Sequence, residues 1–273
     1  MVGPGNATIV AANSQGGLVM IANAMVTDEL DLTPMADCGQ CRYQNTLLAA
    51  GRCKPGDCCV KADSGRQIER FFKVHPGYAS DYAEDEFWER RAIAARYLPT
   101  NRLEPLLDDP DEAVRRALAY RIPLEWLPRL CNDPDREVRV TVADRLPEQQ
   151  LEMMASDPDY LVRVYVARRL PVGRLFRLVV DPDTEVRRIV AERIPRVSLG
   201  LMVNDPEVQI RRIVVQRMEI DDLIMMSQDV DWTVRYEVAL RANSALLEKL
   251  LNDSDEEVRD IAQQRLAVAA MEN

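Results

Sequence analysis

Histidine is nearly absent from this chain, because His75 is the only one among 273 residues. With one histidine we expect neither a Ser–His–Asp set nor a metal site built from several imidazoles. A glycine-rich GxGxxG motif for a dinucleotide is missing as well. These absences argue against an enzyme, and we predict a protein without catalytic residues.

The sequence also lacks a long hydrophobic run and a cationic start. Residues 17–26 form the most apolar stretch near the N-terminus, but Asn23 interrupts it and it is too short to span a bilayer. The first basic residue is Arg42, so the charged region of a secretory signal is missing. We therefore expect a cytoplasmic protein without membrane contact, reduced thiols, and a poorly ordered segment at 1–34.

Basic residues are fewer than acidic residues only in the later part of the chain, after residue 80. The net charge is −10, while residues 1–80 contain seven acidic and seven basic residues, so the excess of acid lies in 81–273. A net-acidic domain is a poor partner for nucleic acid or anionic membranes. We therefore predict no nucleic-acid partner.

A repeat of 24 residues fills the C-terminal two-thirds of the chain. Each copy opens with Asp, has a second acid two residues later, Val or Ile five residues later, and Arg six and twelve residues later. The opening residues are Asp109, Asp133, Asp157, Asp181, Asp205, Asp229 and Asp253, and a weaker copy precedes them from Asp85. Such regular agreement identifies a solenoid.

Each copy predicts two helical elements. Asp109 is expected as the first N-cap, with Pro110 as the first helical residue and Asp111 near the positive end of the helix dipole. In every copy, apolar residues at i, i+4 and i+8 predict a helix that packs inward, and in the earlier copies a proline ends that helix. The remaining residues allow only about two further turns, which favours a short 3₁₀ segment.

The pattern DPDxxVRxxVAxRLPxxxLxxL over residues 85–273 resembles the leucine-rich repeat variant family. The resemblance implies an all-α solenoid of about eight repeats, in which α and 3₁₀ helices alternate along a right-handed superhelix. No segment alternates with period two, so we predict no sheet. In the last three copies Glu219, Asn243 and Ala267 replace the helix-ending proline, which predicts a change of geometry or the end of the superhelix.

The two arginine columns allow two interpretations. One is a groove that binds anions or nucleic acid. The other is structural: Asp111 and Arg115 have the favourable i,i+4 spacing, worth about 0.3–0.5 kcal/mol per exposed pair, and the second column suits the negative end of a helix. Arg also suits planar bonding between stacked repeats. We favour the structural interpretation.

A few variable positions carry unusual side chains. Tyr160 with Val164, and Trp232 with Tyr236, are expected to share the outward face of a helix. They are candidates for contacts with a protein partner, or for packing against a neighbouring repeat. Cys131 takes a place that small apolar residues fill in other copies, so we predict a core residue.

Five of the six cysteines lie close together, in the pattern CxxC, then a single Cys, then an adjacent pair: Cys38, Cys41, Cys53, Cys58 and Cys59. In a reducing compartment such a cluster favours a metal over disulfides. Four thiolates suit either tetrahedral zinc or a cubane iron–sulfur cluster, and the spacing alone leaves both open.

Residues 37–97 also resemble the iron–sulfur domain that precedes such repeats in the same family. The matching motifs are DCxxC (37–41), GRCxPGDxCV (51–60), SGRQIERFF (64–72), HPGYASDY (75–82) and RAxAxRYLP (91–99). The resemblance implies a [4Fe–4S] cluster held by Cys38, Cys41, Cys53 and Cys59. Cys58 departs from the motif and is the alternative fourth ligand. We place this domain at 35–84 and the solenoid at 85–273.

Residues 64–72 predict an amphipathic helix between the two parts. Ser64 is the expected N-cap, and Ile68, Phe71 and Phe72 would face inward and give the cluster an apolar wall. We favour an iron–sulfur protein whose cluster state modulates docking of a protein partner, and the resemblance indicates a nitrogenase-related one. The alternatives are a small electron carrier that docks through the solenoid, or a zinc-binding interaction protein.

Overall fold

The computed structural model describes residues 35–271, and every regular element in that range is a helix. α-Helices and short 3₁₀ helices alternate along the solenoid, which confirms the predicted fold class. The one β contact among the described residues is an isolated antiparallel bridge between Lys54 and Cys58. The poor order expected for 1–34 concerns residues outside the described range.

The α-helices begin in the cysteine-rich module and continue to the C-terminal end of the described chain. They are α1 (Gly65–Val74), α2 (Trp88–Ala95), α3 (Glu112–Ala119), α4 (Arg136–Arg145), α5 (Tyr160–Arg169), α6 (Thr184–Arg193), α7 (Val208–Arg217), α8 (Trp232–Arg241), α9 (Ser244–Leu250) and α10 (Glu256–Met271). None of these helices combines the length and the apolar character that a bilayer crossing needs.

The other helical segments are shorter and tighter, apart from a π-helical turn, η1 (Gln44–Leu48), among the cysteines. The 3₁₀ segments are η2 (Pro76–Tyr82), η3 (Thr100–Arg102), η4 (Glu104–Asp108), η5 (Leu124–Leu130), η6 (Leu151–Met154), η7 (Val172–Leu178), η8 (Arg196–Met202) and η9 (Ile220–Met226).

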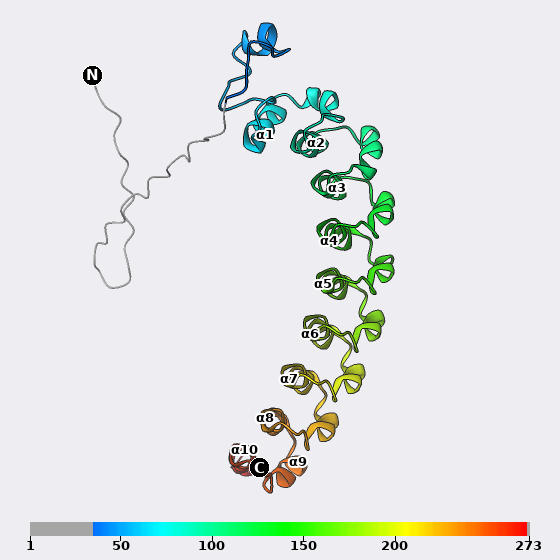
Figure 1. Ribbon diagram of the computed structural model, residues 1–273. Helices are drawn as coiled ribbons and strands as arrows, with labels where there is room; N and C mark the ends of the chain where they lie inside the picture. Colours follow the sequence, from blue (N-terminus) through cyan, green and yellow to red (C-terminus); the bar gives the residue numbers. More distant parts are fainter. Residues whose placement is uncertain (1–34, 272–273) are drawn as a thin grey trace, which may run out of the picture.

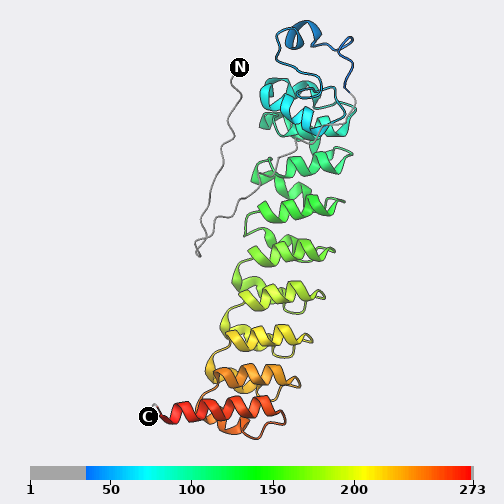
Figure 2. The ribbon, with the colours of Figure 1, turned by 90° about the vertical axis from the view of Figure 1, so that its left-hand side faces the viewer.

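The solenoid is a curved stack of two layers. The α-helices line the inside of the curve and the 3₁₀ segments form the outside (Figure 1), while successive α-helices lie nearly parallel to one another (Figure 2). The cysteine-rich module covers the first repeats at the N-terminal end. The core lies between the two layers, where Val138, Val142 and Leu146 are fully buried as the stripe predicts.

In α3 to α8 the second acid of the repeat, not the first, holds the N-cap position, so the prediction for Asp109 is wrong. Asp111 is the N-cap of α3, and its Oδ1 accepts a hydrogen bond from the backbone N–H of Ala113 at 2.9 Å. Asp109 instead accepts the N–H of Asp111 at 2.9 Å and the guanidinium of Arg91. Pro110 therefore lies in the turn before the helix, because Asp109 is occupied by the preceding repeat.

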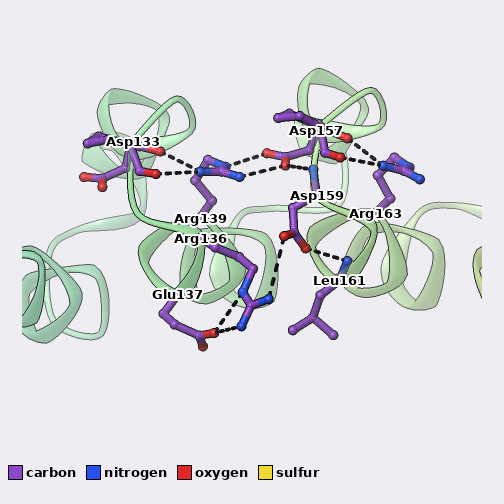
Figure 3. A network of polar contacts seen from close by, with 10 residues as sticks. Asp133, Arg136, Glu137, Arg139, Asp157, Asp159, Leu161 and Arg163 are labelled. Carbon is purple, nitrogen blue, oxygen red and sulfur yellow. Dashed lines mark hydrogen bonds and ion pairs between the residues drawn. The ribbon is translucent and has the colours of Figure 1, made fainter.

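The first arginine column joins each repeat to the next (Figure 3). Arg139 donates from Nε and Nη2 to the carboxylate of Asp157 at 2.8 and 3.1 Å, and from Nη1 to the carbonyl oxygen of Asp133 at 2.8 Å. The same two-pronged pair recurs as Arg91–Asp109, Arg115–Asp133, Arg163–Asp181, Arg187–Asp205, Arg211–Asp229 and Arg235–Asp253. The predicted i,i+4 pairing of Asp111 with Arg115 is wrong. The guanidinium of Arg115 instead binds the buried carboxylate of Asp133 in the neighbouring repeat.

The second arginine column caps helices of the preceding repeat. Arg145 donates to the carbonyl oxygens of Ala119 at 2.6 Å and Ile122 at 3.1 Å, and Arg121 does the same for Ala95 and Leu98. These carbonyls end a helix and have no partner within it. Both columns therefore hold repeats together, in agreement with the structural interpretation.

The repeat changes at its C-terminal end, where the helix-ending proline is lost. Glu219 still precedes a 3₁₀ segment, η9, but Asn243 caps an α-helix, α9, through a hydrogen bond from the N–H of Leu246 at 3.0 Å. Ala267 lies inside α10, which runs on to Met271. The solenoid thus ends in two α-helices rather than in a further α/3₁₀ unit.

The predicted outward pairs differ in outcome. Trp232 and Tyr236 lie side by side, with ring centroids 6.4 Å apart, and Trp232 is exposed. Tyr160 is exposed too, but Val164 is buried, so that pair does not share an outward face. Cys131 is buried, as predicted.

Candidate metal centre

The cysteine-rich module is a compact set of turns around η1. The CxxC segment is a tight turn, in which the N–H of Cys41 donates to the carbonyl oxygen of Cys38 at 3.3 Å. Further on, Lys54 and Cys58 exchange two backbone hydrogen bonds at 3.0 and 2.8 Å. Gly56 lies at the tip of this small hairpin with φ of 79°, a conformation that glycine adopts without strain. This hairpin is the turn that brings Cys53 near Cys59.

The walls of one cavity hold four of the thiols, namely Cys38, Cys41, Cys53 and Cys59. The other lining residues are the uncharged Ala36, Tyr43, Gln44 and Leu48 and the charged pair Asp37 and Lys61. Cys58 does not line this cavity, although it is partly buried against the core. The structure therefore brings together the four cysteines of the predicted set and leaves the alternative ligand outside.

The four thiols belong to residues that line the cavity, but they do not converge on one point. All six cysteines are free thiols, and within residues 35–271 no three His, Cys, Asp or Glu side chains lie close enough to hold a single ion. A cubane cluster takes one thiolate at each of its four irons. Four cysteines on the walls of one cavity supply the donor set that such a group needs.

Burial and neighbouring thiols raise the pKa of two of the cavity cysteines, Cys38 and Cys53. Burial, followed by the neighbouring Cys59 and Cys58 thiols, raises the pKa of Cys53 to about 12. Burial, Cys59 and Cys41 also raise the pKa of Cys38. A thiol must lose its proton to bind a metal, so binding at this site is expected to release protons. The same coupling includes Cys58, which acts on Cys53 more strongly than Cys41 or Cys38 does, so Cys58 also lies near this group of thiols.

Helix α1 forms the apolar support beside the cavity. Ile68, Phe71 and Phe72 are fully buried, as predicted, and the Phe71 ring lies 5.6 Å from the ring of Tyr43, a residue of the cavity wall. The backbone N–H of Cys59 donates to the carbonyl oxygen of Gln67 at 3.2 Å. Ser64 is at the predicted N-cap position, but its side chain makes no capping hydrogen bond. One end of the cavity is thus fastened directly to α1.

Two residues that support the cysteine cavity were not predicted from the sequence. The buried ring of His75 bonds through Nε2 to the carbonyl oxygen of Arg52 at 2.7 Å, which ties the end of α1 to the residue before Cys53. Tyr82 is also buried, and its hydroxyl lies 3.4 Å from that of Tyr43. Both belong to the motif HPGYASDY, which marked the region without indicating a role.

Comparisons with known proteins agree with this division of the chain. Residues 34–81 match the family described as "LRV protein FeS4 cluster", and residues 88–111, 136–159 and 160–183 match "Leucine rich repeat variant". A solved structure described as "a leucine-rich repeat variant with a novel repetitive protein structural motif" is 54% identical, with a TM-score of 0.77, and the match covers 85% of this chain and 100% of that one.

A curated relative from Rhodobacter capsulatus is described as an "uncharacterized 27.7 kDa protein in nifB 3'region". It is 40% identical over 97 residues, which are 35% of this chain and 39% of the relative's length. Fold, cysteine module and matches together define an iron–sulfur-binding repeat protein. The chain belongs to the leucine-rich repeat variant family.

Proposed function

We propose that the protein carries a [4Fe–4S] cluster on Cys38, Cys41, Cys53 and Cys59, and that its solenoid is a scaffold on which a partner protein docks in a cluster-dependent way. The observation that carries the proposal is the cavity that these four thiols share and that Cys58 does not line. The match to an FeS4 cluster family supports the same group. The proposed division is 35–84 for the cluster module and 85–273 for the repeats.

The bound cluster would supply one-electron chemistry at this site. The chain's own contribution is to hold it: four thiolates take its irons, and the buried Cys53 and Cys59 keep water from half of the ligand set. Cys38 and Cys41 are only partly buried and form the side nearer to solvent. Because the protein would hold all four irons, we expect no substrate site on the cluster, and we propose a non-enzymatic role. We place this role in the cytoplasm, where thiols stay reduced.

Metal and sulfide analysis of anaerobically purified protein tests the proposal. We expect about four irons and four sulfides per chain and a broad absorbance near ~400 nm. The Cys131→Ala variant is the matched control, since its buried thiol lies in the solenoid core and its loss should leave the iron content unchanged. A colourless protein with one zinc per chain would overturn the cluster and support the zinc-binding alternative.

A second candidate function is electron transfer to a redox partner chosen by the solenoid. The relative in the nifB 3′ region supports a nitrogen-fixation setting, and hence a nitrogenase-related partner, for either function. Voltammetry on the purified holoprotein separates the two. A reversible reduction within the range of cellular carriers favours electron transfer. A cluster that resists reduction there, while its removal changes partner binding, favours the docking scaffold.

A further inference from the structure

A groove of about 850 Å³ lies next to the cluster module, on the inside of the solenoid's curve. It is bounded by α1, α2 and α3, so that one wall belongs to the module and the other two to the first repeats. The volume is in the range of sites that take a substantial ligand. The groove is also where the regular stack of repeats meets a helix that runs outside the repeat.

The groove is positively charged on a protein that is strongly negative. Four arginines line it, Arg66, Arg96, Arg116 and Arg121, against the two acids Glu69 and Glu89, which gives a formal charge of +2 where the whole chain has −10. Arg121 is occupied by the backbone carbonyls of Ala95 and Leu98. Arg66, Arg96 and Arg116 are exposed along the groove, where Arg96 also pairs with Glu69.

The floor and rim of the groove are apolar. Ile93 and Ala117 are buried in the floor, while the rings of Trp88 and Tyr120 are 42% and 62% exposed at the rim. Exposed aromatic rings beside guanidinium groups are the residue types that dominate binding energy at protein interfaces. Arg also binds carboxylates through two parallel hydrogen bonds. An acidic segment with apolar side chains complements both features.

Helix α1 connects this groove to the cysteine cavity. One part of α1 accepts the backbone hydrogen bond of Cys59 at Gln67, and Arg70 pairs with Asp57 at the hairpin between Cys53 and Cys58. The adjacent residues Arg66 and Glu69 face the groove. Glu69 also accepts hydrogen bonds from Arg96 at 3.0 Å and from the hydroxyl of Tyr97. A change in the position of Cys59 would therefore move α1, whose residues Arg66 and Glu69 form one wall of the groove.

We propose that the groove between α1, α2 and α3 binds an acidic, apolar segment of a partner protein, and that α1 makes this binding depend on the integrity of the cluster site. The inference deepens the proposed function by naming the docking surface and the chemistry of the partner. Its first half stands on the groove alone, and its second half rests on the proposed cluster.

The test is a selection from a phage-displayed library of random dodecapeptides on the immobilised holoprotein, followed by fluorescence anisotropy with the enriched peptides. We expect Asp- and Glu-rich sequences with Leu or aromatic residues, and about a tenfold loss of affinity in Arg96→Glu. Arg129→Glu is the matched control. Like Arg96 it is exposed and pairs with one glutamate, Glu104 at 2.8 Å, but it lies on η5 in the outer layer.

Each outcome decides one half of the proposal. Basic or neutral peptides, or equal losses in Arg96→Glu and Arg129→Glu, would overturn the groove as the site. Tighter peptide binding after removal of residues 1–34 would assign the groove to the chain's own acidic segment instead of a partner. Iron analysis and absorbance report on the cluster independently. If a folded, cluster-free protein binds the peptides as tightly as the holoprotein does, the coupling through α1 is wrong.

Discussion

Arg163 binds Asp181 of the next repeat through two hydrogen bonds, both 2.8 Å long, and the two side chains are only 9% and 3% exposed. The third contact of Arg163 is the carbonyl oxygen of Asp157, the opening residue of its own repeat. Each guanidinium therefore joins the start of one repeat to the start of the next. Because neighbouring repeats are the main contacts in a solenoid, these pairs set how well the stack holds together.

Removal of one partner from this pair should be costly. Arg163→Met leaves the buried carboxylate of Asp181 without its cation, and we expect a loss of about 3–5 kcal/mol in the free energy of unfolding. Urea unfolding followed by circular dichroism measures it. The control is Arg188→Met, which breaks ion pairs with Glu185 and Glu192. All three side chains are 38–44% exposed, so the change should cost about 1 kcal/mol or less. Equal losses in both variants would mean that the buried pairs do not hold the repeats together.

The N-cap of α7 offers a stabilising substitution. Glu207 occupies the cap position but makes no side-chain hydrogen bond there, whereas Asp183 in the preceding repeat accepts from the N–H of Glu185 at 2.9 Å. Glu207→Asp shortens the side chain so that it can accept the N–H of Gln209, and we expect a gain of about 0.5–1 kcal/mol. The urea midpoint of the variant should rise. The reverse change, Asp183→Glu, should lower it by a similar amount, and a midpoint that does not move in either variant would contradict the cap assignment.

The choice between the adjacent cysteines is open to a direct test. Only Cys59 lines the cavity, so Cys59→Ala should lose most of the bound iron while Cys58→Ala keeps it. Iron and sulfide per chain, measured on anaerobically prepared protein, report the result. A full complement in Cys59→Ala together with loss in Cys58→Ala would assign the fourth ligand to Cys58.

Cys131 provides a pH-dependent contribution to stability. Burial, with Asp157 as the second cause, raises the pKa of this thiol from 9.0 to about 11. The folded state therefore favours the neutral thiol, and stability is fully present below pH 9 and falls as the pH rises from about 9 to about 11. Cys131→Val, with the residue found at Val179 and Val203 in later repeats, removes the titration. We expect the unfolding midpoint of the native protein to fall relative to that of the variant across this range, and parallel curves would refute the assignment.

The same burial predicts low reactivity of the Cys131 thiol. In the folded protein at pH 8 the thiolate fraction is small and the side chain is 6% exposed, so an alkylating reagent should leave Cys131 unmodified until the chain unfolds. Mass spectrometry of peptides from the treated native protein measures this. Rapid labelling of Cys131 at pH 8 would show that the core around η5 opens readily.

The repeat period, the buried stripe and the alternation of α and 3₁₀ helices follow from local patterns, and they were predictable from the sequence. The stripe at Val138, Val142 and Leu146 needs only helical spacing, and the prolines need only their missing N–H. The N-cap was misplaced because Asp109 and Asp111 are equally good caps in isolation. The choice between them depends on Arg91, which lies in the preceding repeat.

At the candidate site the sequence indicated which residues gather, and the tertiary structure decided how they are arranged. Spacing and resemblance selected four cysteines, but no local rule separates Cys58 from Cys59. The hairpin at Gly56 and the bond from Cys59 to Gln67 orient the two neighbours differently. Likewise, the sequence shows the two arginine columns but not their partners. These partners lie 18 residues ahead for the first column and 26 residues behind for the second. Such partners are chosen only when repeats stack, because burial beside a carboxylate or a free carbonyl then outweighs the exposed i,i+4 pair.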